Sequence, residues 1–367
     1  MGQAYLSTDR AEPEDSLDKA AALGVLGFLL LLATTPLAAQ QGIVQSPIGS
    51  AGLALVPIAD GYRVEDLAGV RATLAVSPGT RLTAIAELAG GWIATGARLV
   101  SDGAELVLWL NDGSSTRAIG EPGERFAFRR DPLALVEKGR LAAVAWLEGD
   151  GGENNAVAVA RRIGESWETV QTVSPLTGAA QLALSGAVLD DGSWLLVWAA
   201  VDGEDEEILW SRFDGTAWSS PTRLHPDNSV ADIVPAVAAV KSGAVAAWSQ
   251  FDGKDYRLKI AGFDGEGWHD TGFVGEKGSL YPTAFPSETG VGFLYQTVIP
   301  RTWSLVVVSS GGRLARRAAT ARISEPRPVV VSTQADSVAL RFASVEPEAS
   351  GAGRASIETR LEWLRAP

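Results

Sequence analysis

Short hydrophobic runs alternate with turns rich in glycine and aspartate along most of this chain. Within residues 182–224, four such runs lie at 182–188, 193–200, 208–213 and 219–224. Each run is rich in Val, Ile, Leu or Trp and is bounded by Gly or Asp, which is typical of short strands joined by hairpin turns. Beyond the N-terminal segment, no window longer than about three turns keeps a helical apolar stripe. The pattern therefore predicts an all-β protein.

The pattern repeats with a period close to 50 residues. Trp198 recurs as Trp248, and Trp218 recurs as Trp268, each after 50 residues. Four short strands in each repeat of 40–50 residues are typical of β-propellers, in which every blade is a small antiparallel sheet. One ladder of equivalent positions is aromatic in every unit except the first, where it is Gly96. Its members are Gly96, Trp146, Trp198, Trp248, Tyr295 and Phe342. A second ladder of prolines opens the first strand of most units at Pro132, Pro235, Pro282 and Pro328, with Ala183 in the third unit.

Six such units fit between residue 80 and the C-terminus, which predicts a six-bladed β-propeller of four-stranded antiparallel blades. The last unit offers only three strands, so we expect an N-terminal strand at 71–76 to complete the last blade. The alternatives are an open last blade, or a seven-bladed ring that uses residues 42–76. The predicted blades cover about 80–128, 129–178, 179–229, 230–278, 279–323 and 324–364 with strand 71–76, and residues 41–70 lead into the ring.

The repeat text resembles the BNR-like, sialidase-like propellers over most of residues 80–367. The segments 207–224 and 258–274 are similar to the strand–turn–Trp units of that group. The sialidase Asp-box is Ser-x-Asp-x-Gly-x-x-Trp; Ser211 and Trp218 match it, whereas Asp214 and Gly215 are adjacent instead of separated. The resemblance implies the propeller fold, with sialidase-like glycoside hydrolysis as the alternative function.

The N-terminal segment has the pattern of an export signal. Residues 20–59 carry no charge, and 20–33 form an apolar run that Pro36 ends. Leu37-Ala38-Ala39 supplies small residues for cleavage, so residues 1–40 are predicted to be a signal peptide. The alternative is an uncleaved membrane anchor, since 20–39 is just long enough to span a bilayer. Both place the propeller outside the cytoplasm, periplasmic or secreted, and the membrane is a partner only if this segment stays attached.

Composition narrows the remaining choices. The 367 residues carry a net charge of −13 and no basic cluster, which argues against nucleic acid as a partner. About 320 residues after the leader suit one all-β domain, which we expect to be a monomer. The chain has no cysteine, which excludes disulfides, a cysteine nucleophile and a His/Cys metal cluster. The chain has twelve tryptophans, and those of the ladders are expected to pack between blades with their indole N–H groups hydrogen-bonded.

Candidate catalytic residues are few. The two histidines, His225 and His269, are expected at the surface, and no Gly-x-Ser-x-Gly elbow accompanies them. Tyr62-Arg63-Val64-Glu65 resembles the sialidase motif that carries the first of three arginines, although Glu65 replaces its proline. The sialidase alternative requires Arg63 and two further arginines to meet Tyr281 and a carboxylate in one pocket. No catalytic residue is predicted, and whether the protein is an enzyme stays open, with binding favoured.

Acidic hairpin turns are the candidates for a cation. Asp202 and Asp205 lie in one turn, and Asp252 and Asp255 lie in the equivalent turn of the next unit. Carboxylate-rich loops can hold calcium, but the EF-hand spacing is absent and Asp-Gly turns need no ion. The prediction is therefore no cofactor, with calcium at these four aspartates as the alternative.

A polar ring is predicted where the first strands begin, at the mouth of the central channel. Its residues differ from blade to blade, which suits an asymmetric ligand, and the alternative is ordinary solvated loop ends. The predicted function is a non-catalytic module that binds a glycan or an extracytoplasmic protein; a structural part of an envelope assembly is a third possibility. The predicted channel-mouth residues are Arg81, Arg130, Asp131, Gln181, Asp232, Tyr281 and Arg327, with Glu325 beside the last.

Overall fold

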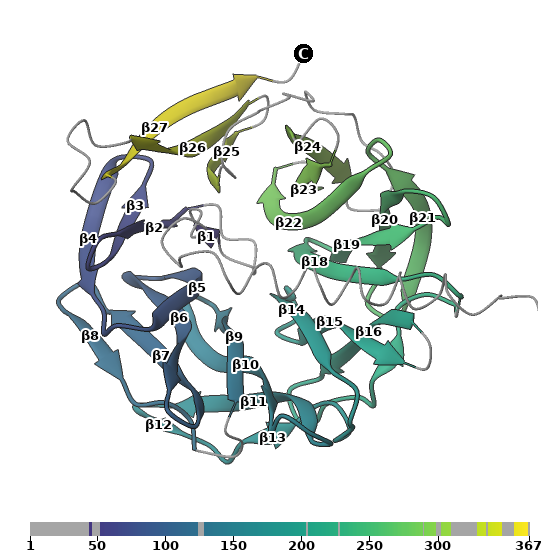
Figure 1. Ribbon diagram of the computed structural model, residues 1–367, viewed down its shortest axis with the longest axis horizontal. Coiled ribbons are helices and arrows are strands. Elements are labelled where there is room, and N and C mark those ends of the chain that lie inside the picture. Colours follow the sequence, from purple (N-terminus) through teal and green to yellow (C-terminus); the bar gives the residue numbers. More distant parts are fainter. Residues whose placement is uncertain are drawn as a thin grey trace, which may run out of the picture. The chain divides into compact units, whose positions relative to one another are not determined.

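The computed structural model describes residues 44–45, 52–123, 128–202, 205–226, 228–288, 290–298, 302–309, 329–334, 337–346 and 356–365. Residues 42–367 form one compact unit, and the predicted leader, residues 1–40, lies outside the described residues. Every regular element described is a β-strand (Figure 1). Among these residues there is no helix of the length and hydropathy that a membrane span requires.

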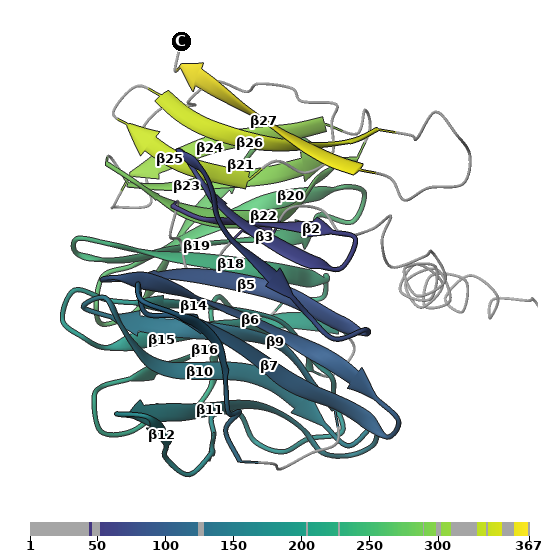
Figure 2. The same cartoon turned by 90° about the vertical axis from the view of Figure 1, so that its left-hand side faces the viewer.

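The strands form seven groups in which chain neighbours pair antiparallel (Figures 1 and 2). The first group is β1 (Val44–Gln45), β2 (Ala54–Ile58), β3 (Gly61–Asp66) and β4 (Gly69–Ala75). The second is β5 (Thr80–Leu88), β6 (Gly91–Val100), β7 (Gly103–Asn111) and β8 (Thr116–Ile119). The third is β9 (Phe128–Glu137), β10 (Arg140–Gly149), β11 (Asn155–Ile163), β12 (Ser166–Trp167) and β13 (Gln171–Thr172), and one bridge, Ala104 to Phe128, joins it to the second.

The remaining groups have the same hairpin order. The fourth is β14 (Gln181–Val188), β15 (Trp194–Asp202), β16 (Asp205–Phe213) and β17 (Thr222–Arg223). The fifth is β18 (Asp232–Val240), β19 (Gly243–Phe251), β20 (Tyr256–Phe263) and β21 (Trp268–Val274). The sixth is β22 (Ser279–Ser287), β23 (Gly290–Thr297) and β24 (Thr302–Ser309), and the seventh is β25 (Val329–Gln334), β26 (Ser337–Glu346) and β27 (Ser356–Arg365).

A recurring bulge bends the first strand of several groups. Asp131, Ala183, Val234 and Tyr281 have positive φ values of 50°, 48°, 52° and 56°, and the strand register shifts beside each of them. Left-handed backbone is costly for side chains other than Gly and is typical of bulges that turn a strand. Three of these residues precede the ladder prolines. In the fourth group Ala183 is itself the bulge residue, so Leu184 takes the proline place and the prediction of Ala183 there is wrong by one residue. Three ladder prolines, Pro132, Pro235 and Pro282, thus mark a bend near the start of β9, β18 and β22.

The aromatic ladder predicted the second strands correctly. Trp146, Trp198, Trp248 and Tyr295 lie on β10, β15, β19 and β23, and all four are buried. Each neighbouring pair of groups shares a buried hydrophobic cluster. The first and last groups also pack together, because Ala54 and Val56 of β2 form one cluster with Val329 and Ala339. The fold is therefore β-propeller-like, with its core between successive sheets.

The predicted N-terminal closing strand is wrong. Residues 71–75 belong to β4, which pairs with β3 in the first group. That group supplies the additional sheet of the seven-bladed alternative, and the prediction of six units missed it because no ladder tryptophan marks it. The seventh group has the three strands expected for the last unit, and it contacts the first through side chains. Arg341 of β26 forms an ion pair with Glu65 of β3, with Nη1 and Oε2 2.9 Å apart.

Candidate functional site

Two of the predicted channel-mouth residues, Gln181 and Asp232, accept hydrogen bonds from buried ladder tryptophans. The indole N–H of Trp198 donates to Oε1 of Gln181 at 2.7 Å, and that of Trp248 donates to Oδ1 of Asp232 at 2.7 Å. Gln181 and Asp232 are both buried. The expectation of hydrogen-bonded indole N–H groups is confirmed for Trp198 and Trp248, whose indoles these two polar side chains orient. It is wrong for Trp218 and Trp268, whose buried N–H groups, like that of Trp194, have no acceptor within the described part of the chain.

The other predicted mouth residues reach the surface to differing degrees. Arg81 and Arg130 are exposed, whereas Asp131 and Tyr281 are half-buried. Arg130 donates to the backbone carbonyl of Gln181 in the next group and lies 3.8 Å from the Asp131 carboxylate. Burial raises the pKa of the Tyr281 hydroxyl. Glu325 and Arg327 lie outside the described residues, and ligand binding by this ring stays a prediction.

The sialidase and calcium alternatives rest on residues that have local partners. Nε of Arg63 lies 3.2 Å from Oε1 of the buried Glu65. Glu65 also pairs with Arg341 of the last group, so the Arg63 guanidinium belongs to an ion-pair cluster where the first and last groups meet. The Asp252 carboxylate accepts the backbone N–H groups of Lys254 and Asp255 at 3.1 and 2.8 Å, which is the Asx-turn geometry. Asp202 pairs with Asp205 across the equivalent turn.

A surface groove lies between the second and third groups, where four hairpin turns meet. It has a volume of about 950 Å³ and opens at the β5–β6, β7–β8, β9–β10 and β11–β12 turns. This is the end of the strands opposite to the predicted channel mouth. The basic side chains at the groove are Arg117, Lys138, Arg140 and Arg162, and the acidic ones are Asp112, Glu137 and Glu165. The groove thus has a small positive excess in a chain whose net charge is −13.

Close packing of the turns holds the groove in shape. The backbone N–H of Ala89 donates to the carbonyl of Gly139 at 2.8 Å, which ties the β5–β6 turn to the β9–β10 turn. Gly139 has a φ of 73°, and a Cβ there would lie 2.7 Å from the Cβ of Ala89. Only glycine combines this backbone with so close an approach. One wall of the groove is therefore formed where the second and third groups pack together.

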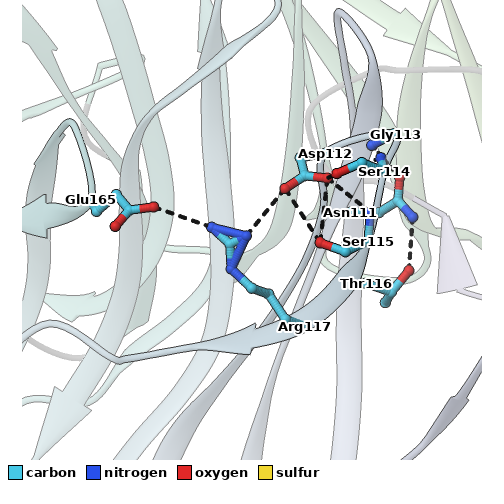
Figure 3. A network of polar contacts seen from close by, with 8 residues as sticks. All are labelled: Asn111, Asp112, Gly113, Ser114, Ser115, Thr116, Arg117 and Glu165. Carbon is cyan, nitrogen blue, oxygen red and sulfur yellow. Dashed lines mark hydrogen bonds and ion pairs between the residues drawn. The ribbon is translucent and has the colours of Figure 1, made fainter.

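Arg117 spans the groove between two carboxylates (Figure 3). Its guanidinium lies 3.1 Å from Oδ2 of Asp112 and 3.5 Å from Oε1 of Glu165, which belong to different groups. Asp112 also accepts the hydroxyl of Ser114 at 2.7 Å and the backbone N–H of Ser115 at 2.9 Å. These hydrogen bonds, with the one from the Ser114 N–H, hold the pKa of Asp112 well below its usual range. Asp112 is therefore ionised at neutral pH and fixes Arg117.

Arg162 adds a second guanidinium to the same groove. Burial lowers its pKa, and the like charge of Arg117 acts in the same direction. Its guanidinium lies 5.1 Å from the Trp167 ring centroid, and its Nε donates to the carbonyl of Gly164 at 3.1 Å. The planar group is thus held over an aromatic face beside another cation. An anion placed between the two guanidinium groups would offset their repulsion.

A buried cluster of titratable groups joins the fourth and fifth groups. Glu207 comes from β16, His225 follows β17, and Asp232 begins β18. Nε2 of His225 lies 2.9 Å from Oδ2 of Asp232 and 3.9 Å from Oε2 of Glu207. The His225 ring stacks on Trp248 with centroids 5.2 Å apart and an interplanar angle of 12°. Its side chain is 7 % exposed, so the prediction of a surface histidine is wrong for His225, whereas it is confirmed for His269, at 66 %.

The environment of this cluster shifts two pKa values upward. Burial and the neighbouring Asp232 charge raise the pKa of Glu207 to about 7, against smaller opposite effects of His225, the Asn228 backbone N–H and Arg223. Burial of the His225 imidazole lowers its pKa, and Lys259 acts the same way. The hydrogen bond to Asp232 and the charges of Asp232 and Glu207 outweigh them, so the pKa of His225 is raised.

The free energy of unfolding is expected to fall as the pH rises through this range. A carboxyl with a raised pKa stabilises the fold fully below its unfolded value of about 4.5, and this contribution is lost as the pH rises through about 7. The raised pKa of His225 acts in the same direction from about 6.5 upward. Glu207→Gln keeps the neutral shape and also removes a charge that raises the pKa of His225. Urea unfolding in buffer with EDTA should show a flatter decline for Glu207→Gln between pH 4.5 and 7, and an unchanged slope would contradict this reading.

The sequence held a usable signal for part of this cluster. Gln181 and Asp232 lie 17 and 16 residues before the tryptophans that they accept from. The two offsets differ by one residue, and a polar residue at about this distance before a ladder tryptophan indicates an indole acceptor. Nothing local connects Glu207 to His225 or marks the groove, since both depend on contacts between strands or turns distant in the sequence.

Comparisons with known proteins support the fold alone. No protein-family model and no curated protein sequence matches the chain. Among solved structures, an ulvan lyase of the PL25 polysaccharide lyase family aligns with a TM-score of 0.55 at 8% identity, covering 89% of this chain and 93% of that one. A protein of unknown function from Dyadobacter fermentans aligns with a TM-score of 0.50 at 16% identity, covering 79% and 100%. A puromycin hydrolase aligns with a TM-score of 0.47 at 17% identity over 79% of this chain, which spans about half (48%) of that enzyme.

Proposed function

We propose that this protein is a non-catalytic propeller module that binds an acidic glycan in the groove between its second and third strand groups. The convergence of Arg117 and Arg162 in that groove is the observation that carries the proposal. Both guanidinium groups line one cavity of about 950 Å³, which is within the size range of small-molecule sites. The proposal narrows the broader prediction of a glycan- or protein-binding module to sugars that bear carboxylates.

The chemistry of the groove favours recognition over proton transfer. A guanidinium presents a planar fork that matches a carboxylate with two hydrogen bonds. The ionised Asp112 and the nearby Asn111 supply hydrogen-bond acceptors for sugar hydroxyls. With its pKa held low, Asp112 has no proton to donate at neutral pH. The groove therefore suits a ligand that combines negative charge with hydroxyl groups.

The alternative function is a divergent sialidase-like glycoside hydrolase. It requires Arg63 to bind a substrate carboxylate beside Tyr281. Arg63 lies on β3 and forms an ion pair with Glu65 of the same strand, whereas Tyr281 lies on β22 of the sixth group. We also infer that the seven strand groups close into a ring of seven blades, which the shared β2–β25–β26 cluster supports. We further infer that the ring acts outside the cytoplasm and as a monomer.

A panel of oligosaccharides tests the proposal. Residues 41–367 are applied to uronic acid oligosaccharides, to the same oligosaccharides with the carboxyls reduced to alcohols, and to neutral sugars. We expect binding to the uronic acid forms only, weakened by added salt because the contacts are ionic. Equal binding to the reduced forms, or binding only to an acidic peptide series, would contradict it. Repeating the panel with EDTA separates the groove from a calcium-dependent site at the acidic hairpins.

A further inference from the structure

The buried cluster of Glu207, His225 and Asp232 contains a carboxylate with unmet bonding capacity. Glu207 is fully buried, and within the described part of the chain no side chain donates a hydrogen bond to either of its carboxylate oxygens, although the backbone N–H of Asn228 lies nearby. A buried charged group without partners is costly, so such a group usually pairs, coordinates a metal or takes up a proton. The Glu207 carboxylate lies beside one imidazole nitrogen and a second carboxylate.

The three groups are spaced as ligands of one ion. Nε2 of His225, one oxygen of Asp232 and one oxygen of Glu207 all lie within 4.8 Å of one another. Ligand atoms about 2.1 Å from a tetrahedral zinc ion are about 3.4 Å apart. The measured separations from Nε2, 2.9 and 3.9 Å, lie on either side of that value. Small side-chain shifts would bring all three atoms to one centre.

Outer partners already orient two of these groups. Asp232 accepts hydrogen bonds from Trp248, Gln250 and Asn228 at 2.7, 2.8 and 2.7 Å. The Trp248 ring stacks on His225 and fixes the plane of its imidazole. Metal ligands in proteins are typically held by such hydrogen bonds and packing, which set the direction of the donor atoms.

Charge also favours a dication at this position. With Glu207 deprotonated and His225 neutral, the forms that bind a metal, the three side chains carry a charge of −2, which one divalent ion neutralises. The charges of Arg223 and Lys259 also act on the cluster. An imidazole with two carboxylates suits zinc among common divalent ions, whereas calcium prefers six to eight oxygen ligands. The exposed residues Pro226 and Ser229 between β17 and β18 place the cluster just beneath the surface.

We propose that Glu207, His225 and Asp232 form a zinc site in which each residue gives one ligand atom and a water molecule takes the fourth position. The site would link β16, the segment after β17 and β18, and so connect two neighbouring strand groups. It is independent of the proposed glycan groove, which lies between other groups.

Zinc titration of the metal-free protein tests the site, with competition against a chromophoric chelator. We expect one zinc ion per chain and a rise in melting temperature on binding. His225→Gln should weaken zinc affinity on the order of 100-fold, since loss of an outer partner alone costs 10- to 100-fold. His269→Gln is the matched control, because His269 is exposed beside a single carboxylate, Asp264, at 2.6 Å. This variant should bind zinc like the parent.

Glu207→Gln is the second variant, since it keeps the buried shape and decides the question if His225→Gln does not fold. It should also lose zinc affinity, by at least about tenfold. Visible absorption of a cobalt-substituted sample should show the intense bands of four-coordinate geometry. Binding of less than one zinc per chain, equal loss in the His269 variant, unchanged affinity in Glu207→Gln, or a response to calcium alone would each overturn the proposal.

Discussion

Trp198→Ala should lower the free energy of unfolding by about 3–5 kcal/mol, which is typical of removing a large buried aromatic side chain. Trp198 is completely buried on β15 and belongs to a cluster that joins the third and fourth groups. Its removal would leave a cavity between two sheets and would strip Oε1 of Gln181 of its indole donor. The change therefore affects packing and a buried hydrogen bond together.

Equilibrium urea unfolding, followed by circular dichroism, measures this effect. Trp198→Phe should cost less, because it keeps most of the buried ring and loses the hydrogen bond. Leu176→Ala is the control, since Leu176 is 46% exposed and its removal should change stability by less than about 0.5 kcal/mol. A loss below about 1 kcal/mol for Trp198→Ala would show that the aromatic ladder does not hold neighbouring sheets together.

Arg162→Gln should weaken binding of a uronic acid oligosaccharide by about 10- to 100-fold, which corresponds to the loss of a charged hydrogen bond worth 1.5–3 kcal/mol. Arg117→Gln should have a similar effect, because both guanidinium groups line the groove. Each variant should also bind with a shallower salt dependence, since one ionic contact is gone. Isothermal titration at several salt concentrations measures both quantities.

Arg71→Gln is the matched control for these two variants. Arg71 is an exposed arginine on β4 that pairs with Asp66, outside the groove. It carries the same charge change as the groove variants without touching their surface. If it weakens binding as much as Arg162→Gln does, net charge accounts for the affinity and the groove does not. Unchanged melting temperatures of all three variants would confirm that the comparison concerns binding.

The sequence predicted those parts of the fold that rest on repeated local chemistry. Trp146, Trp198 and Trp248 mark second strands because each fills the equivalent space between two sheets. The spacing between them along the chain therefore corresponds to one strand group. The residues before three of the ladder prolines likewise form an equivalent bulge in their first strands. The first group has no such landmark. At its contact with the last group, Glu65 pairs with Arg63 and Arg341 in place of an aromatic contact.

The candidate sites could be predicted only in part. Asp232 was recognised as a special position, but its environment depends on Trp248 and on His225, which the chain brings in after a separate strand. The groove depends on the contact of the Gly139 turn with Ala89, a juxtaposition of two groups that neither turn encodes alone. A sequence repeat reveals the residues that every blade shares. A functional site made of residues that differ between blades can be located only once the pairing of the strands is known.

A crystal structure of residues 41–367 with a bound uronic acid oligosaccharide would locate the ligand. We expect the sugar in the groove between the second and third groups, with a carboxylate within hydrogen-bond distance of Arg117 or Arg162. Sugar at the starts of the first strands, beside Arg81, Arg130 and Tyr281, would contradict the groove and support the channel-mouth prediction made from the sequence.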